Sequence, residues 1–74
     1  MSRAIVTGSF DPVTAGHEDL IRRAAAVFDA VIVVVAENRG KTYLFSSEER
    51  LDFVKKTCEG LKNVSVRFSH RNQR

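Results

Sequence analysis

Apolar residues follow two rhythms along this chain, one typical of strands and the other of helices. Residues 4–6 form a short apolar run within a predicted strand at 4–7, and residues 31–36 form a continuous, largely β-branched run. A strand buried on both faces of a parallel sheet has such a composition. Residues 64–68 alternate apolar and polar side chains, as a half-buried strand does. The pattern therefore predicts three strands.

Two helices are predicted between these strands. Residues 16–28 repeat apolar side chains at helical spacing on one face, namely Leu20, Ile21, Ala24, Val27 and Phe28. The second helix is predicted to begin with a capping box, with Ser46 as N-cap and Glu49 at the third helical position, and to end near Gly60. Its apolar stripe consists of Leu51, Val54, Cys58 and Leu61.

Strands that alternate with helices predict an α/β fold with a parallel sheet and right-handed crossovers. The β-α-β-α-β order is that of one mononucleotide-binding half of a Rossmann-like fold, in which ligands bind at the carboxyl ends of the strands. Two loops, residues 9–17 and 37–41, follow the first two strands. We therefore expect both loops to lie at the same rim of the sheet.

The first of these loops suits phosphate chemistry. The N–H groups of a helix's first turn attract anions, and glycine lets a phosphate approach the backbone closely. Thr14 is a good N-cap candidate, which places His17 at the third helical position, beside the positive end of the helix dipole. The plainer interpretations are a capping role for Thr14 and a surface histidine at a helix start.

The segment Gly-Ser-Phe-Asp-Pro-Val-Thr-Ala-Gly-His at residues 8–17 resembles the nucleotidyltransferase superfamily, whose mark is (H/T)-x-G-H after the first strand. With a second block at residues 38–50, it is most similar to bacterial phosphopantetheine adenylyltransferases. The resemblance runs from Ala4 to about Ser69. The chain departs from the family at Thr7, Arg39 and Tyr43, where proline is common.

The resemblance implies that 4′-phosphopantetheine and ATP, with Mg²⁺ arriving on the nucleotide, give dephospho-coenzyme A and pyrophosphate. His17 would stabilise the transition state, and Lys41 would meet the attacking phosphate. The implied ATP-binding residues are Ser9, Phe10, Gly16 and His17, and the implied acceptor-binding residues are Ser9 and Lys41. The plainer interpretations are a turn serine, a core phenylalanine, a first-turn glycine and a solvated lysine.

The 74 residues match only the N-terminal half of the family's domain, over residues 1–69, and a divergent polar tail follows at 70–74. We expect this half to be an inactive fragment. The resemblance also implies that intact members of the family form hexamers. One alternative is a catalytically silent nucleotide-binding or oligomerising fragment. Another is a different member of the superfamily, such as a cytidylyltransferase or a nicotinate-nucleotide adenylyltransferase, which usually has histidine at the position of Thr14.

Charge and composition change this picture little. Residues 1–36 carry three basic and four acidic side chains, and residues 37–74 carry nine and five, which sums to +3. A solvated helix face explains the lysines at 55, 56 and 62 better than a nucleic-acid site does. With no membrane-length apolar run and no leader, we expect a cytoplasmic protein. The single cysteine, Cys58, is expected to pack in the core.

Overall fold

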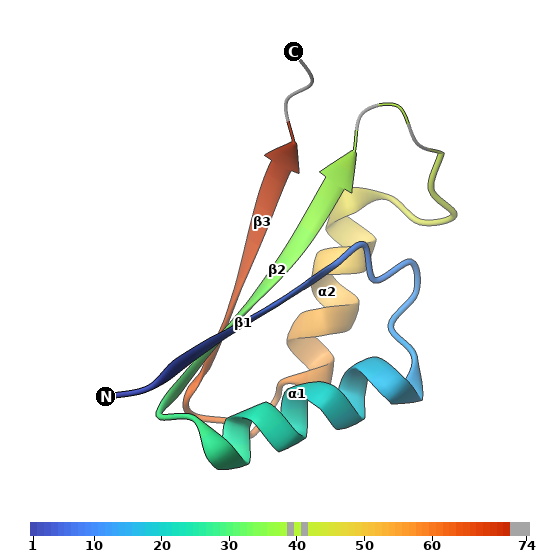
Figure 1. Ribbon diagram of the computed structural model, residues 1–74. Helices are drawn as coiled ribbons and strands as arrows, with labels where there is room; N and C mark the ends of the chain where they lie inside the picture. Colours follow the sequence, from blue (N-terminus) through green and yellow to red (C-terminus); the bar gives the residue numbers. More distant parts are fainter. Residues whose placement is uncertain (39, 41, 72–74) are drawn as a thin grey trace.

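The described residues form three parallel strands and two helices (Figure 1). The computed structural model describes residues 1–38, 40 and 42–71, with the backbone alone at residues 38, 70 and 71. In chain order the elements are β1 (Arg3–Gly8), α1 (Ala15–Val27), β2 (Ala30–Asn38), α2 (Ser47–Thr57) and β3 (Val64–Arg71). The predicted α/β class and β-α-β-α-β order are confirmed.

The sheet has the order β1-β2-β3, with both neighbouring pairs parallel. Both right-handed crossovers step in the same direction across the sheet, so both helices lie on the same face (Figure 1). Between the sheet and the helices lies the core, in which Val33 of β2, Ile21 of α1 and Val54 of α2 are fully buried. Every second residue of β2 faces this layer.

The other face of the sheet is open within the described part of the chain. The expectation that residues 31–36 are buried on both faces is wrong for every second residue. Val31, Val33 and Val35 have no exposed surface, whereas Ile32 and Val34 are only half-buried. On β1 the Ile5 side chain, which pairs in register with Ile32, is 67% exposed. The pattern predicted a strand with two covered faces, but both helices cover the same one.

Helix α1 turns a narrower apolar stripe to the sheet than its sequence predicted. Ile21 is fully buried and Ala24 packs against the core, whereas Leu20 is 52% and Val27 is 74% exposed. Leu20 and Val27 are seven residues apart and share one flank of the helix. The side of α1 that packs against the core carries the small side chains of Ala24 and Ala25 beside Ile21.

The ends of the elements follow local chemistry. Ser46 and Glu49 form the predicted capping box at the start of α2. Helix α2 ends at Thr57, and the turn after it contains Gly60 at φ +87°, a conformation that favours glycine. Strand β3 continues through Arg71, beyond the alternation predicted for residues 64–68, and stays paired with β2 as far as Asn38. In the part of the chain that the structure describes, no helix is long and apolar enough to cross a bilayer.

Candidate functional site

The loop that follows β1 and the segment that precedes α2 are bound together at the carboxyl end of the sheet. The carboxylate of Asp11 accepts hydrogen bonds from the backbone N–H groups of Leu44, at 2.6 Å, and Phe45, at 2.8 Å. The parallel pairing of β1 with β2 places the ends of both strands at this edge, as predicted. The residues that Asp11 binds lie just beyond the second predicted loop, of which residues 39 and 41 fall outside the described part of the chain. Nothing in the sequence pointed to this contact of Asp11, because a hydrogen bond across 33 residues leaves no local pattern.

Thr14 and His17 cap each other at the start of α1. The Thr14 hydroxyl accepts a hydrogen bond from the His17 backbone N–H at 3.4 Å, and the Thr14 backbone N–H donates to Nδ1 of His17 at 3.2 Å. The predicted N-cap and the third helical position of His17 are both confirmed. A backbone amide can only donate, so Nδ1 is the acceptor in this contact and Nε2 is the ring nitrogen left to donate elsewhere.

The ring of Phe10 packs against the ring of His17. Its side chain is 1% exposed, and its ring meets the His17 ring edge-on, with 4.9 Å between the ring centroids. Its backbone has φ 52°, which is uncommon for a residue with a side chain. The residue as a whole belongs to the core, as the plainer interpretation expected, and its role in binding ATP stays a prediction.

Gly16 and Ser9 lie at opposite ends of this loop and in different surroundings. Gly16 is exposed, and a Cβ atom built on it would meet only the Thr14 hydroxyl oxygen, at 3.7 Å. Ser9 is half-buried, and its carbonyl accepts a hydrogen bond from Arg50. Their binding roles stay predictions. The prediction for Lys41 falls outside the described residues.

Arg50 is a residue of this region that the sequence reasoning missed. It is 1% exposed and donates to the carbonyls of Phe45 and Ser9, both at 3.2 Å, and to the carboxylate of Glu37. Its guanidinium carbon lies 4.0 Å from the centre of the Tyr43 ring. A sequence signal existed, because Arg50 precedes Val54 by one helical turn and so occupies a position of the buried stripe.

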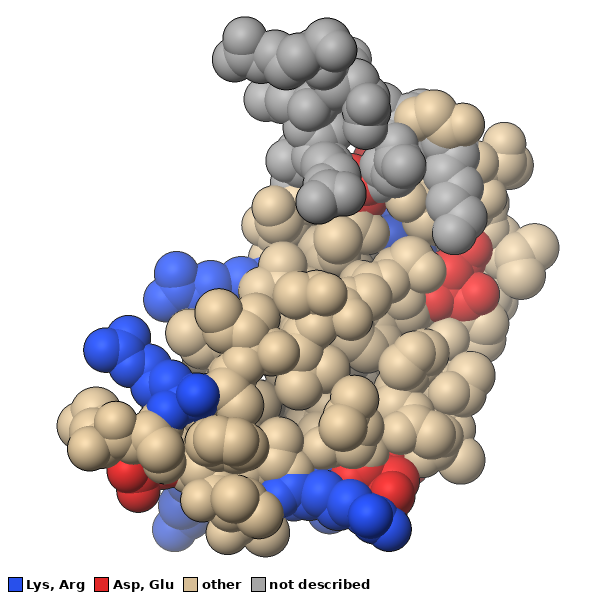
Figure 2. All heavy atoms as spheres, in the orientation of Figure 1, with Lys and Arg blue, Asp and Glu red and all other residues tan. Residues whose placement is uncertain are grey.

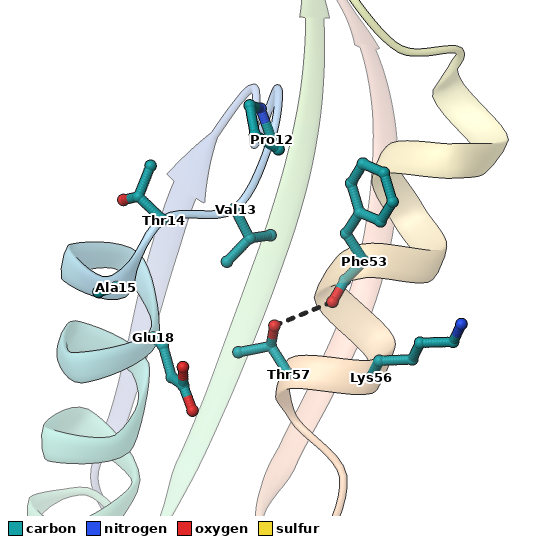
Figure 3. Close-up of a pocket in the computed structure, with 8 residues that line it drawn as sticks. All are labelled: Pro12, Val13, Thr14, Ala15, Glu18, Phe53, Lys56 and Thr57. Carbon is teal, nitrogen blue, oxygen red and sulfur yellow. Dashed lines mark hydrogen bonds between the residues drawn. The ribbon is translucent and has the colours of Figure 1, made fainter.

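A separate groove lies between the two helices (Figure 3). It is lined by Pro12, Val13, Thr14, Ala15, Glu18, Phe53, Lys56 and Thr57. Val13 projects into the space between the helices, and Thr57 donates to the carbonyl of Phe53 at 2.9 Å. The groove includes neither Ser9 nor His17 among its lining residues, so it is not the predicted phosphate site.

Charged side chains on the helix surfaces pair within their own helices. Arg22 with Glu18 and Arg23 with Asp19 are four residues apart on α1, as are Lys56 and Asp52 on α2. On the face shown in Figure 2, uncharged atoms occupy the middle and basic side chains stand at the left and lower margins. The sequence therefore folds with part of its basic charge already neutralised by neighbouring carboxylates.

The remaining reactive groups have structural surroundings. Cys58 is 7% exposed, as predicted, and burial raises the pKa of its thiol, an effect that Arg22 opposes. Among the described residues, no three His, Cys, Asp or Glu side chains come together in a way that would hold a metal ion. Both carboxylate oxygens of Asp11 already accept backbone hydrogen bonds.

Comparison with known proteins gives closely related sequences. The chain is 52% identical over 66 residues to a phosphopantetheine adenylyltransferase of Nocardioides sp., a match that covers 89% of this chain and 42% of the relative. It is 53% identical over 66 residues to the enzyme of the same name from Dictyoglomus turgidum, covering 89% and 41%. The chain thus spans about two-fifths of the length of these relatives.

A solved structure and a family profile are also similar to this chain. The crystal structure of the NadR protein, in complex with NAD and AMP-PNP, superposes with a TM-score of 0.80 at 25% identity, covering 97% of this chain and 21% of that protein. The sequence profile described as cytidylyltransferase-like matches residues 5–71, which include every strand and helix described above apart from the first two residues of β1. The chain therefore belongs to the cytidylyltransferase-like family of nucleotidyltransferases.

Proposed function

We propose that this chain is the phosphate-binding half of an adenylyltransferase that joins ATP to 4′-phosphopantetheine and releases pyrophosphate and dephospho-coenzyme A. The observation that carries the proposal is the mutual cap of Thr14 and His17 at the carboxyl end of a parallel sheet. The identity of about half of its residues with phosphopantetheine adenylyltransferases supports this choice of substrates. A cytoplasmic location fits such a biosynthetic role.

The reaction needs positioning and charge stabilisation more than a protein nucleophile. An oxygen of the acceptor phosphate attacks the α-phosphorus of ATP, and the bond from that phosphorus to the β-phosphate bridging oxygen breaks. No covalent bond to the protein forms. During the transfer, negative charge builds on the oxygens of the α-phosphate, where a fixed hydrogen-bond donor stabilises it most effectively. The Nε2–H of His17 suits this role because the Thr14 N–H holds the ring and its tautomer.

The other predicted site residues take simpler roles in this proposal. Gly16 leaves room for a phosphate at the first turn of α1, and Ser9 meets the phosphates of both substrates. Lys41, outside the described residues, would neutralise the acceptor phosphate. Mg²⁺ is expected as part of the Mg·ATP substrate, since such ions are commonly held through substrate phosphates and the donors described here suit no resident ion.

Two observations keep two further substrate pairs in the test. The family profile is described as cytidylyltransferase-like, and the structural neighbour was crystallised with NAD and AMP-PNP. A cytidylyltransferase or a nicotinate-nucleotide adenylyltransferase would use the same fold. We rank both lower because the relatives at about 50% identity carry the other name.

A chimera tests the proposal directly. In it, residues 1–69 of this chain replace the segment of the Nocardioides relative that they match. Pyrophosphate release is measured with Mg²⁺ and each of three substrate pairs: ATP with 4′-phosphopantetheine, ATP with nicotinate mononucleotide, and CTP with phosphocholine. We expect turnover with the first pair alone, at a rate comparable with the unaltered relative.

The outcomes separate the candidate functions. Turnover with a different pair would assign the chain to another branch of the superfamily. A folded chimera that binds ATP and turns over no pair would favour the silent nucleotide-binding fragment. The unaltered relative, assayed in parallel, shows that the substrates and the assay are sound.

A further inference from the structure

Arg50 and Asp11 connect the segments of the candidate site from opposite directions. Arg50, on α2, reaches back to the loop after β1 through the Ser9 carbonyl and to the end of β2 through the Ala36 carbonyl, at 3.2 and 3.5 Å. Asp11, in the loop after β1, reaches forward to the backbone before α2 at Leu44. We call these two side chains the rim clasp.

The rim clasp includes a buried charge, the guanidinium of Arg50, that is hydrogen-bonded to the phosphate-binding loop. Four hydrogen bonds use the Nε, Nη1 and Nη2 atoms of Arg50, and all four acceptors belong to the protein. Glu37 neutralises its charge, and the Tyr43 ring covers one face of the guanidinium. Because these donors are satisfied within the protein and the residue is only 1% exposed, we assign Arg50 no direct contact with a substrate phosphate.

A buried ion pair of this kind is a poor source of net stability, because desolvating the charges offsets most of their attraction. It does impose geometry, since the planar guanidinium satisfies its acceptors only in one arrangement. What it fixes here is the turn before α1. The Ser9 carbonyl that it binds precedes Phe10, whose backbone is in the left-handed region and whose ring supports His17.

From this geometry we propose that Arg50, assisted by Asp11, is a positioning residue for the phosphate-binding loop. It fixes Ser9 and Phe10, and through the Phe10 ring it fixes the imidazole of His17. The assignment rests on the proposed function, because Ser9 and His17 are its predicted substrate contacts. It adds to that function a residue of α2 that touches no substrate.

Three variants of the chimera probe the rim clasp. Arg50→Lys keeps the charge and loses the planar fork, Arg50→Met keeps the length and loses every donor, and Asp11→Asn leaves one acceptor oxygen for two N–H groups. Two controls match them. Arg23→Met removes a 78% exposed arginine of α1, and Ile21→Val loosens the core without touching the clasp.

Each variant is measured for its thermal midpoint, for kcat and both KM values, and for amide hydrogen exchange. We expect Arg50→Lys and Asp11→Asn to lower kcat/KM by about tenfold or more, since small misplacements of reacting groups cost this much. If Ile21→Val loses as much in thermal midpoint as the rim-clasp variants do, it should still lower kcat/KM by less than about threefold. When Ser9→Ala is already present, Arg50→Lys should lower kcat/KM by a smaller factor than it does alone, because the effects of coupled residues are non-additive.

Hydrogen exchange tests the clasp without any substrate. The amides of Leu44 and Phe45 should exchange faster in Arg50→Lys and in Asp11→Asn, while Val33 in the centre of β2 keeps its protection. Turnover by the unaltered chimera decides the proposed function separately, so a chimera without turnover still reports on the clasp through exchange.

Three results would overturn the assignment. One is an activity loss in Arg50→Lys no larger than that of Ile21→Val at an equal thermal midpoint. A second is full multiplication of the Arg50→Lys and Ser9→Ala effects. The third is unchanged exchange at Leu44 and Phe45. If Arg50→Met fails to fold, Arg50→Lys and Asp11→Asn still decide among these results.

Discussion

Replacing Gly16 with Ala should stabilise the protein and impair it at the same time. Gly16 is the second residue of α1, and its backbone lies outside the left-handed region. The added Cβ meets one atom, the Thr14 hydroxyl oxygen, at the ordinary contact distance of 3.7 Å. Nothing described within this chain therefore requires a glycine at this position.

The gain in stability follows from the cost of glycine in a helix. Alanine is favoured over glycine there by roughly 0.5–1 kcal/mol. In the chimera, a protein in the range of 150–250 residues, this corresponds to a rise in thermal midpoint of roughly 1–4 °C. The loss of function has a different origin, since the same methyl group occupies the space that we assign to a nucleotide phosphate. We expect a KM for ATP that is higher by about tenfold or more, the effect of about 1.4 kcal/mol of lost binding.

Differential scanning fluorimetry and steady-state kinetics on the same preparations measure both effects. Ala15→Gly is the matched control, because it changes the neighbouring exposed position of the same turn in the opposite sense. It should lower the thermal midpoint by a similar amount and leave the KM for ATP nearly unchanged. A Gly16→Ala variant with the original KM would refute a nucleotide role for this glycine, and a lower midpoint would refute the geometry of the first turn.

Further predictions concern single residues and the chain by itself. His17→Ala should lower kcat of the chimera by about a hundredfold or more, with ATP affinity within about threefold by equilibrium binding; an unchanged kcat would remove His17 from the reaction. Lys41→Ala should slow turnover and weaken binding of the acceptor, measured by calorimetry, and a main loss in ATP affinity would reverse its assignment. Because burial raises the pKa of the Cys58 thiol, the folded chain holds less thiolate at pH 8 than the chain unfolded in urea. A disulfide reagent should therefore label Cys58 at least about tenfold more slowly in the folded chain. The 74-residue chain alone should release little pyrophosphate and should self-associate in sedimentation velocity, since Ile5 and its open sheet face are uncovered; turnover comparable with that of the chimera would contradict this.

The order and type of the elements could be read from the sequence because they depend on local chemistry. The β-branched run at 31–36 and the helical spacing of Val54 and Cys58 each report a preference of neighbouring residues. The two capping motifs, at Thr14 and Ser46, are likewise local, and the structure confirms both. The parallel sheet follows from the alternation of strands and helices, and the shared rim of the two loops follows from the parallel sheet.

The arrangement that only the tertiary structure decided depends on contacts between distant segments. Both helices cover the same face of the sheet, which leaves Ile5 exposed although its run of sequence is that of a buried strand. Arg50 is buried because carbonyl and carboxylate acceptors from three separate segments meet around it, and the Asp11 carboxylate binds backbone amides across 33 residues. Such hydrogen bonds follow from where the folded chain brings its segments, and neither propensity nor periodicity carries that information. The sequence by itself therefore determined which residues begin α1, whereas the fold decided which distant side chains bind the loop before it.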